Sequence, residues 1–203
     1  MIGKIFPKIS TRGFYDLKTG KTLRNTSYEI YPKTSFETIS KKSEIVIMIH
    51  GLRNNKSGAL TKYVIAEKRL KYLKYPYDVV GYSYDSNTAG VQYKSTALHA
   101  LRVGVTIAKK NGKNLSAFLI YVKKSFPHLK IRLIGHSLGS QVILSALVNL
   151  KNKKLVESVH IFGASIPANS VSTKKFGTII QKTVNQKFVR SEEHTSELQS
   201  RPH

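Results

Sequence analysis

Short, continuous apolar runs recur along the chain and alternate with longer segments of helical spacing. The runs are EIVIMIHG (44–51), YDVVGYSY (77–84), KIRLIG (130–135) and VESVHIFG (156–163). Continuous apolar character over such a length is typical of a strand that is buried on both faces of a sheet. Strands that alternate with helices form a parallel sheet with helices on both faces and right-handed crossovers. The sequence therefore predicts an α/β fold with a mostly parallel sheet.

Apolar residues at helical spacing predict the intervening helices. Ser57 has the residue type of an N-cap and is expected to begin the first of them. Asn111 and Gly112 are turn formers, so they are expected to divide one long helical segment into two helices. A further strand is expected to start at Lys187. The predicted helices cover residues 57–73, 93–108, 114–126, 138–150 and 173–186.

The first 43 residues precede this alternation and are polar and rich in turn formers. FYDLKTGKTLRN (14–25) predicts a hairpin with Thr19 and Gly20 at its turn, and TSYEIYP (26–32) is expected to continue its second strand. A chain of 203 residues, 40% of them hydrophobic, buries one substantial core. We therefore expect one domain over residues 1–189, with this hairpin region (1–43) before a parallel core (44–189).

The composition excludes several classes of protein. The absence of cysteine excludes disulfides and cysteine metal sites, and no other metal or cofactor motif is present, so we expect neither a metal nor a cofactor. The N-terminus MIGKIFPKIS has no signal-peptide core, and no run approaches the roughly 18 apolar residues of a spanning helix. We expect a soluble, cytoplasmic protein.

The formal net charge of +23 raises the question of a nucleic-acid partner. Only eight of the 34 basic residues are arginines, and lysine is the weaker residue for bidentate recognition of bases and phosphates. The lysines are spread along the chain, and no nucleic-acid-binding motif is present. We expect no specific nucleic-acid partner, while a weak attraction to an anionic membrane surface stays open. The sequence does not indicate the oligomeric state.

The segment IRLIGHSLGSQVI (131–143) contains the motif G-x-S-x-G, formed by Gly135, His136, Ser137, Leu138 and Gly139. It lies between an apolar run and an amphipathic segment. A serine nucleophile must stand on a sharp strand-to-helix turn, which requires small residues two positions before and after it. The helix that follows directs its N-terminal amides and positive dipole end at the reacting centre. Ser137 is therefore the candidate nucleophile; a structural Gly-Ser turn is the alternative.

A second motif, MIHGL (48–52), follows the first apolar run. In this architecture the loop after that strand supplies one amide of an oxyanion hole, and the residue after the nucleophile supplies the other. His50 and Gly51 therefore form the candidate oxyanion loop, and the backbone amides of Leu52 and Leu138 are the candidate donors. The alternative is an ordinary turn at the end of a strand.

These motifs together resemble those of the α/β-hydrolase superfamily, in particular its lipase- and esterase-like serine hydrolases. The resemblance is carried by IVIMIHG (45–51), RLIGHSLGSQV (132–142) and VHIFGAS (159–165) and covers about residues 44–189. It implies the α/β-hydrolase fold and cleavage of a carboxylic ester or thioester, with a small-molecule acyl ester or a lipid as substrate. An acyltransferase, or a non-catalytic scaffold that binds lipid or protein, are the alternatives.

The resemblance also implies an acid and a histidine that follow Ser137 in the chain. The exit of the next strand, GASIPANSV (163–171), holds no Asp or Glu, so both residues are expected beyond Val189. Instead, Arg190–Ser200 resembles a translated sequencing adapter. We therefore expect a truncated fold that is incomplete at its C-terminus, a non-native or disordered tail at 190–203, and an inactive chain; a genuine disordered tail is the alternative.

Other titratable residues are weaker candidates. Asp85 ends the run 77–84 on the same sheet edge as Ser137. It is expected to line the pocket or to cap residues 86–90, because its place in the chain order argues against a triad acid. His136 is expected to brace neighbouring loops. The remaining histidines of the core are expected to be structural or exposed: His99, His128 and His160.

Overall fold

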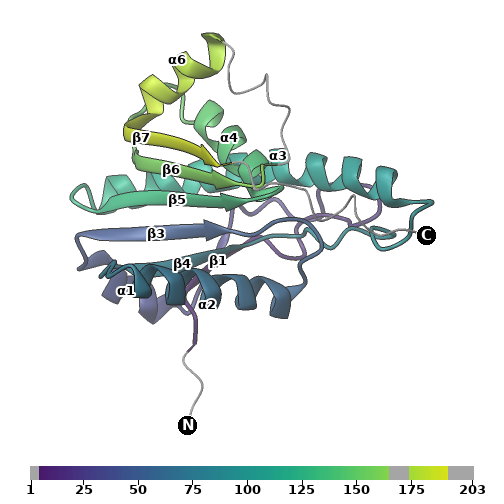
Figure 1. Ribbon diagram of the computed structural model, residues 1–203, viewed down its shortest axis with the longest axis horizontal. Coiled ribbons are helices and arrows are strands. Elements are labelled where there is room, and N and C mark those ends of the chain that lie inside the picture. Colours follow the sequence, from purple (N-terminus) through teal and green to yellow (C-terminus); the bar gives the residue numbers. More distant parts are fainter. Residues whose placement is uncertain (1–4, 165–173, 192–203) are drawn as a thin grey trace.

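The computed structural model describes residues 5–164 and 174–191. Their centre is a seven-stranded sheet in the order β2-β1-β4-β3-β5-β6-β7 (Figure 1). All neighbouring strands are parallel except β1 and β2. The strands are β1 (Lys8–Ser10), β2 (Glu29–Tyr31), β3 (Glu44–Ile49), β4 (Asp78–Ser83), β5 (Lys130–His136), β6 (Val156–Phe162) and β7 (Val184–Ser191).

Helices cover both faces of this sheet. On one face, Ala59 and Tyr63 of α2 pack against Val46, Met48 and Val79. On the other face, α3 and α4 enclose the larger part of the core (Figure 1). The helices are α1 (Lys33–Ser40), α2 (Lys56–Tyr72), α3 (Ala97–Ser125), α4 (Gly139–Asn149) and α6 (Lys174–Thr183). The mostly parallel sheet with helices on both faces confirms the predicted α/β fold class.

The core strand β3 is buried along its whole length. Ile45, Ile47 and Ile49 face the α3 side, whereas Val46 and Met48 face the α2 side. Successive side chains of a strand point to opposite faces, so only a strand covered on both sides is apolar at every position. This burial explains the continuous apolar run in the sequence.

The predicted break at Asn111 and Gly112 is wrong, because α3 is one continuous helix of 29 residues. The Asn111 side chain accepts hydrogen bonds from the hydroxyls of Thr11 (2.5 Å) and Tyr82 (3.0 Å). A Cβ atom at Gly112 would lie 2.2 Å from the Cβ of Ser145 in α4. Tertiary contacts therefore explain both residues, one by a buried polar contact and the other by close helix packing.

The N-terminal region differs from the predicted hairpin. Within residues 14–25 a single antiparallel bridge joins Tyr15 and Thr22, with Gly20 at a φ of 72° in the turn. The strand expected to continue it is β2, which pairs with β1 instead. Neither β1 nor α1 was predicted, because β1 has only three residues and finds its main partner, β4, far along the chain.

The start of α2 also differs from the prediction. Asn55, not Ser57, is the N-cap, and its side chain accepts a hydrogen bond from the Gly58 N–H at 2.9 Å. The Ser57 hydroxyl donates to that same side chain at 2.9 Å. Two capping residue types thus lie within one turn, and the sequence alone does not decide between them.

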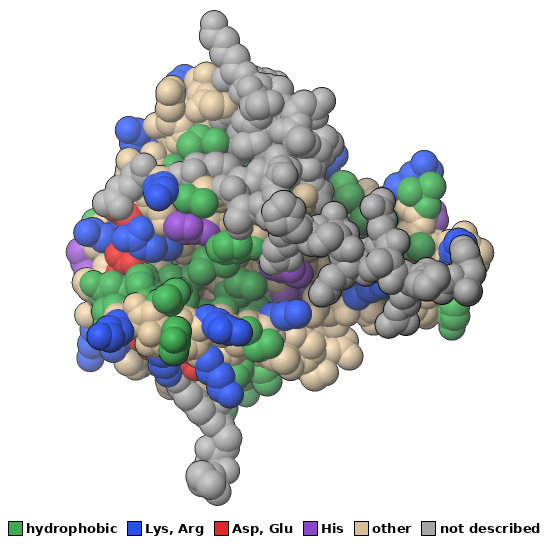
Figure 2. Space-filling view, in the orientation of Figure 1, with side chains coloured by type: hydrophobic (Ala, Val, Ile, Leu, Met, Phe, Trp, Pro, Cys, Tyr) green, Lys and Arg blue, Asp and Glu red, His purple; other side chains and the backbone are tan. Residues whose placement is uncertain are grey.

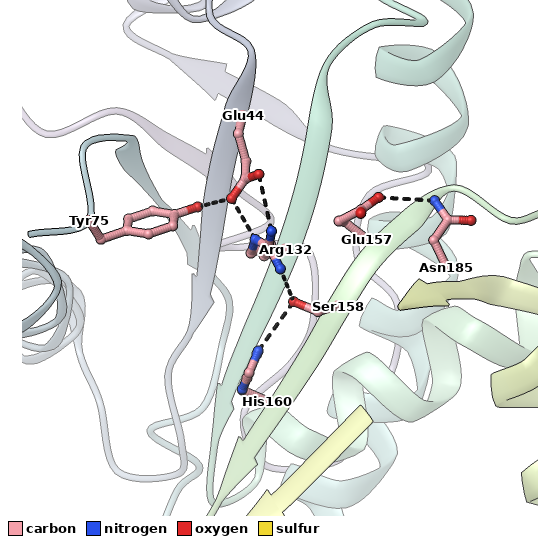
Figure 3. A network of polar contacts seen from close by, with 7 residues as sticks. All are labelled: Glu44, Tyr75, Arg132, Glu157, Ser158, His160 and Asn185. Atoms are coloured by element: carbon pink, nitrogen blue, oxygen red, sulfur yellow. Dashed lines mark hydrogen bonds and ion pairs between the residues drawn. The ribbon is translucent and has the colours of Figure 1, made fainter. Parts of the chain in front are cut away.

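A polar network crosses β3, β5 and β6 on the α2 side of the sheet (Figure 3). Arg132 donates to the Glu44 carboxylate at 2.5 and 3.2 Å and to the Ser158 hydroxyl at 3.0 Å. The Tyr75 hydroxyl donates to the same carboxylate. Burial of Glu44 opposes its charge, but the bonds from Arg132 and Tyr75 outweigh burial and hold the pKa of Glu44 below its usual value.

The C-terminal strand includes the first two residues of the predicted tail. Arg190 and Ser191 pair with Ile161 and Phe162 at the end of β7. Residues 192–203 lie outside the described residues, as do residues 165–173 of the loop that follows β6.

Lys and Arg side chains are scattered over the face drawn in Figure 2, with apolar side chains between them. No helix in the described part of the chain has both the length and the apolar character that a membrane span requires.

Candidate active site

Ser137 lies at the turn between β5 and α4. Its φ is 51°, in the left-handed region that residues other than glycine rarely adopt. Its N–H donates to the carbonyl oxygen of Phe162 at 2.9 Å. Its own carbonyl oxygen accepts hydrogen bonds from the N–H (3.0 Å) and the hydroxyl of Ser140. These bonds hold the strained backbone in a fixed turn.

Three glycines surround this turn because no larger residue fits. A Cβ atom at Gly139 would lie 2.4 Å from the carbonyl oxygen of Ile49, and one at Gly51 would lie 2.9 Å from the Cβ of Ser137. At Gly135 it would lie 2.7 Å from a side-chain atom of α4. Real Cβ atoms essentially never come closer than 3.0 Å to such neighbours. The loop after β3 therefore lies directly against the candidate nucleophile.

The topology of the sheet explains this meeting. From β3 the chain moves to β4 on one side, and it then returns to β5 on the other side of β3. The carboxyl ends of β3 and β5 consequently form a switch point, where ligands of open α/β sheets bind. Gly51 and Ser137 follow these two strand ends.

Leu52 and Leu138, whose amides are the candidate oxyanion donors, pack against one residue of α3. A Cβ atom at Gly104 would lie 2.7 Å from Cδ1 of Leu52 and 3.3 Å from Cδ2 of Leu138. Leu138 is the N-cap residue of α4 and is fully buried. The close approach of α3 at Gly104 thus keeps the two loops side by side.

His50 is fully buried beside this site and stacks on the Tyr84 ring at 4.6 Å. Its Nε2 lies 3.2 Å from Nη2 of Arg12 and accepts from the Tyr84 N–H at 3.3 Å. Because both partners are donors, the proton lies on Nδ1, which donates to the carbonyl oxygen of Gly51 at 2.9 Å. Burial, with Arg12 beside it, lowers the pKa of His50 to about 3, so the ring stays neutral near pH 7.

This arrangement makes His50 a positioning group in the loop. The carbonyl oxygen of Gly51 also accepts from the Asn54 side chain at 3.1 Å, so it is held on the His50 side. In a trans peptide the N–H points opposite to the C=O. The N–H of Leu52 is therefore directed away from His50.

Arg12 is the residue of this site that sequence reasoning missed. Its guanidinium donates to the Ser83 hydroxyl (2.7 Å) and to the carbonyl oxygens of Asn54 (3.0 Å) and Asn55 (3.1 Å), besides its contact with His50. These partners lie 38 to 71 residues away in the sequence. No local pattern marks such a residue, so only the folded chain identifies it.

Asp85 is buried next to this arginine. Its carboxylate accepts hydrogen bonds from the N–H groups of Gly13 (2.9 Å) and Tyr15 (3.3 Å). Burial raises the pKa of Asp85, although these bonds and Arg12 oppose the increase. Asp85 thus fastens the loop that carries Arg12.

The other four histidines named in the sequence analysis lie in four different places. His136 is half-buried, and its Nδ1 lies against Gly51. His160 lies within β6, where its Nε2 is 3.2 Å from the Ser158 hydroxyl (Figure 3). His99 and His128 are exposed, on α3 and in the turn before β5. The acid and the histidine are predicted beyond Val189. The only described residues there are Arg190 and Ser191, so this prediction lies outside the described part of the chain.

Among residues 5–164 and 174–191, no group of three or more His, Cys, Asp or Glu side chains is placed to hold a metal ion.

Comparisons with known proteins give distant likenesses. A solved acetyl xylan esterase, an iodinated complex, is 12% identical over 73% of this chain and 82% of its own, with a TM-score of 0.47. A Trichoderma reesei cutinase in complex with a phosphonate inhibitor is 18% identical over 65% of each chain, with a TM-score of 0.39. No curated protein matches the sequence. Residues 92–192, which carry Ser137, match the family model described as "Protein of unknown function (DUF726)".

Proposed function

We propose that the protein is a serine hydrolase of the esterase or lipase-like type, which cleaves a carboxylic ester or thioester through Ser137. The observation that carries this proposal is the positive-φ turn at Ser137, held by hydrogen bonds on both sides and packed directly against Gly51. A strained, fixed backbone at a strand-to-helix turn is the geometry that a serine nucleophile needs.

In the proposed reaction, Oγ of Ser137 attacks the acyl carbon and loses its proton to a base. The carbonyl oxygen becomes an oxyanion, which the N–H groups of Leu52 and Leu138 stabilise. The alcohol or thiol then leaves with a proton, and water hydrolyses the acyl-serine. Each oxyanion donor typically contributes a factor of roughly 10²–10³ to the rate.

The proposed base is a histidine and its partner is an acid, and both are predicted to follow Val189. If the chain lacks this pair, it retains only the residual catalysis of the oxyanion hole and substrate binding, roughly 10³–10⁴ over water. Resequencing the gene through the codons for residues 190–203 tests this part. A genomic read that continues through RSEEHTSELQS would contradict the predicted adapter origin.

A fluorophosphonate probe tests the nucleophile. The probe is applied to this chain and to a full-length homologue with the same G-H-S-L-G motif, and the adduct is located by mass spectrometry. We expect fast labelling of the homologue's counterpart of Ser137, much slower labelling of Ser137 in this chain if it lacks the predicted base, and none in either protein after the serine is replaced by alanine. Ser125→Ala, which removes an exposed serine at the end of α3, is the matched control and should change nothing. Equal labelling with and without Ser137 would refute the assignment.

Gly104→Ala is expected to slow this labelling by about tenfold or more while the fold survives. The added Cβ displaces Leu52, whose loop carries one oxyanion donor, but the nearest atom is the end of a flexible side chain. The gain in helix propensity, about 1 kcal/mol, offsets part of the packing cost. Labelling rates and urea unfolding of the same samples check this prediction. An unchanged rate would show that the approach of α3 does not position the loop.

A further inference from the structure

A groove with a volume of about 1290 Å³ opens between α1, α2 and the β1–β2 edge of the sheet. Aromatic and apolar side chains form much of its wall, among them Tyr28, Phe36, Leu60, Tyr121 and Phe126. Ser137, Leu138, Gly51 and Leu52 are not among its lining residues. The groove therefore does not include the proposed nucleophile or oxyanion donors, although Arg12 lines it and also supports the loop that follows β3.

Three cations, Lys8, Arg12 and Lys56, line this groove, and Arg12 donates to the carbonyl oxygen of Asn55, the residue before Lys56. Lys8 points to the α2 side because its neighbour Ile9 is buried in the core on the α3 side, and side chains alternate along a strand. Burial lowers the pKa of Lys8, and the charges of Lys56 and Arg12 lower it further. Both charges therefore lie near enough to Lys8 to repel it.

No carboxylate among the described residues forms an ion pair with any of these three side chains. Asp85 attracts Arg12 from a greater distance, and Lys8 also lies 4.8 Å from the Tyr31 ring centre. Two acids also line the groove, and one of them, Glu29, lies opposite Ser10 in the register of β1 and β2. Glu29 pairs with Arg24 at 3.4 Å, and Glu37 belongs to α1. The cation cluster therefore carries a net positive charge that no ion pair with a described carboxylate neutralises.

Hydroxyl groups lie beside Arg12 in this groove. The hydroxyls of Ser10 and Ser83 line it and accept hydrogen bonds from Arg12, and Lys56 begins α2, whose N-terminus carries a partial positive charge. Lysines act as point charges toward phosphate, and a phosphate monoester carries roughly −1.5 to −2 charges near pH 7. A dianionic head group matches three cations better than a single carboxylate does.

We propose that this groove binds a single-chain lipid with a phosphate head group. The phosphate lies between Lys8, Arg12 and Lys56, and the chain lies along Leu60 and the aromatic wall. The groove volume exceeds the roughly 300–1,000 Å³ of sites for drug-sized ligands, which leaves room for a chain. Binding at this site does not require the reaction at Ser137.

Calorimetric titration with dodecyl phosphate, below its micelle concentration, tests the ligand class. Dodecyl maltoside and inorganic phosphate are the comparators. We expect one site for dodecyl phosphate and at least tenfold weaker binding of both comparators. Equal binding of the maltoside would show that the head group does not matter, and equal binding of inorganic phosphate would show that the chain does not. Either result would overturn the proposal.

Paired variants separate the groove from the general charge of the protein. A net charge of +23 attracts any anion, so the control must remove as many charges as the test. Lys8→Gln with Lys56→Gln should weaken binding of dodecyl phosphate about tenfold or more. Lys62→Gln with Lys68→Gln, on the exposed part of the same helix, should change it less than about twofold. Equal weakening by both pairs would contradict the site.

The chain-binding part of the groove is tested by Leu60→Asn, a neutral change at a side chain that is 43% exposed. We expect it to weaken dodecyl phosphate and to leave inorganic phosphate unchanged. An unchanged affinity for dodecyl phosphate would place the chain elsewhere and refute that part of the proposal.

Discussion

Acidification from about pH 7 to about pH 3 is expected to destabilise the fold by on the order of 4 kcal/mol through His50 alone. The folded-state pKa of His50 is about 3 because its ring is fully buried, whereas an unfolded histidine has a pKa of about 6.5. Between these values the unfolded chain binds more protons than the folded one. The contribution is therefore fully present above about pH 6.5 and decreases as the pH falls through this window.

Urea unfolding at several pH values, with wild type and His50→Gln, measures this effect. The stability of wild type should rise with pH by up to about 1.4 kcal/mol per pH unit more than that of the variant. His99→Gln, at an exposed position on α3, is the matched control and should follow wild type. Equal slopes for wild type and His50→Gln would mean that the buried ring is not the group that titrates.

Asp85 and Glu44 also have shifted pKa values, so the comparison must be made by difference. The pKa of Asp85 is raised by burial, so this group favours the folded state as the pH falls. The pKa of Glu44 is lowered, so its contribution is lost as the pH falls. Both are present in wild type and in His50→Gln, and their contributions cancel when the two curves are subtracted.

The central strands could be predicted from the sequence because a strand that is buried on both faces has a nearly continuous run of apolar residues. In β3 all six residues are buried, and the same run appears in the sequence as EIVIMI. The meeting of Gly51 and Ser137 follows from the same pattern, since parallel strands bring their carboxyl ends to one edge. The fold class and the position of the candidate nucleophile are therefore local properties of the chain.

The supporting residues of the site could not be predicted in this way. Arg12 contacts Ser83 and His50, which are 71 and 38 residues away in the sequence. Each contact forms only when the fold brings the two segments together. The strand β1 has three residues, too few for a periodic pattern. Long-range polar contacts and very short strands leave no local signal.

Replacing Gly112 by alanine is expected to destabilise the protein by about 2–3 kcal/mol, although alanine is the better helix former. The new Cβ would lie 2.2 Å from the Cβ of Ser145 and 2.7 Å from its backbone carbon. Because backbone atoms of α4 cannot move aside as a flexible side chain can, the two helices must separate. For a chain of this size, this corresponds to a decrease in Tm of about 5–10 °C.

Gly177→Ala in α6 is the matched control, since nothing lies within 4 Å of a Cβ atom at that position. The same chemical change should there stabilise the helix by about 0.5–1 kcal/mol. Thermal and urea unfolding of the two variants should therefore shift in opposite directions. If Gly112→Ala also stabilised the protein, helix propensity would outweigh packing at this position. Gly112 would then not be required for the close packing of α3 against α4.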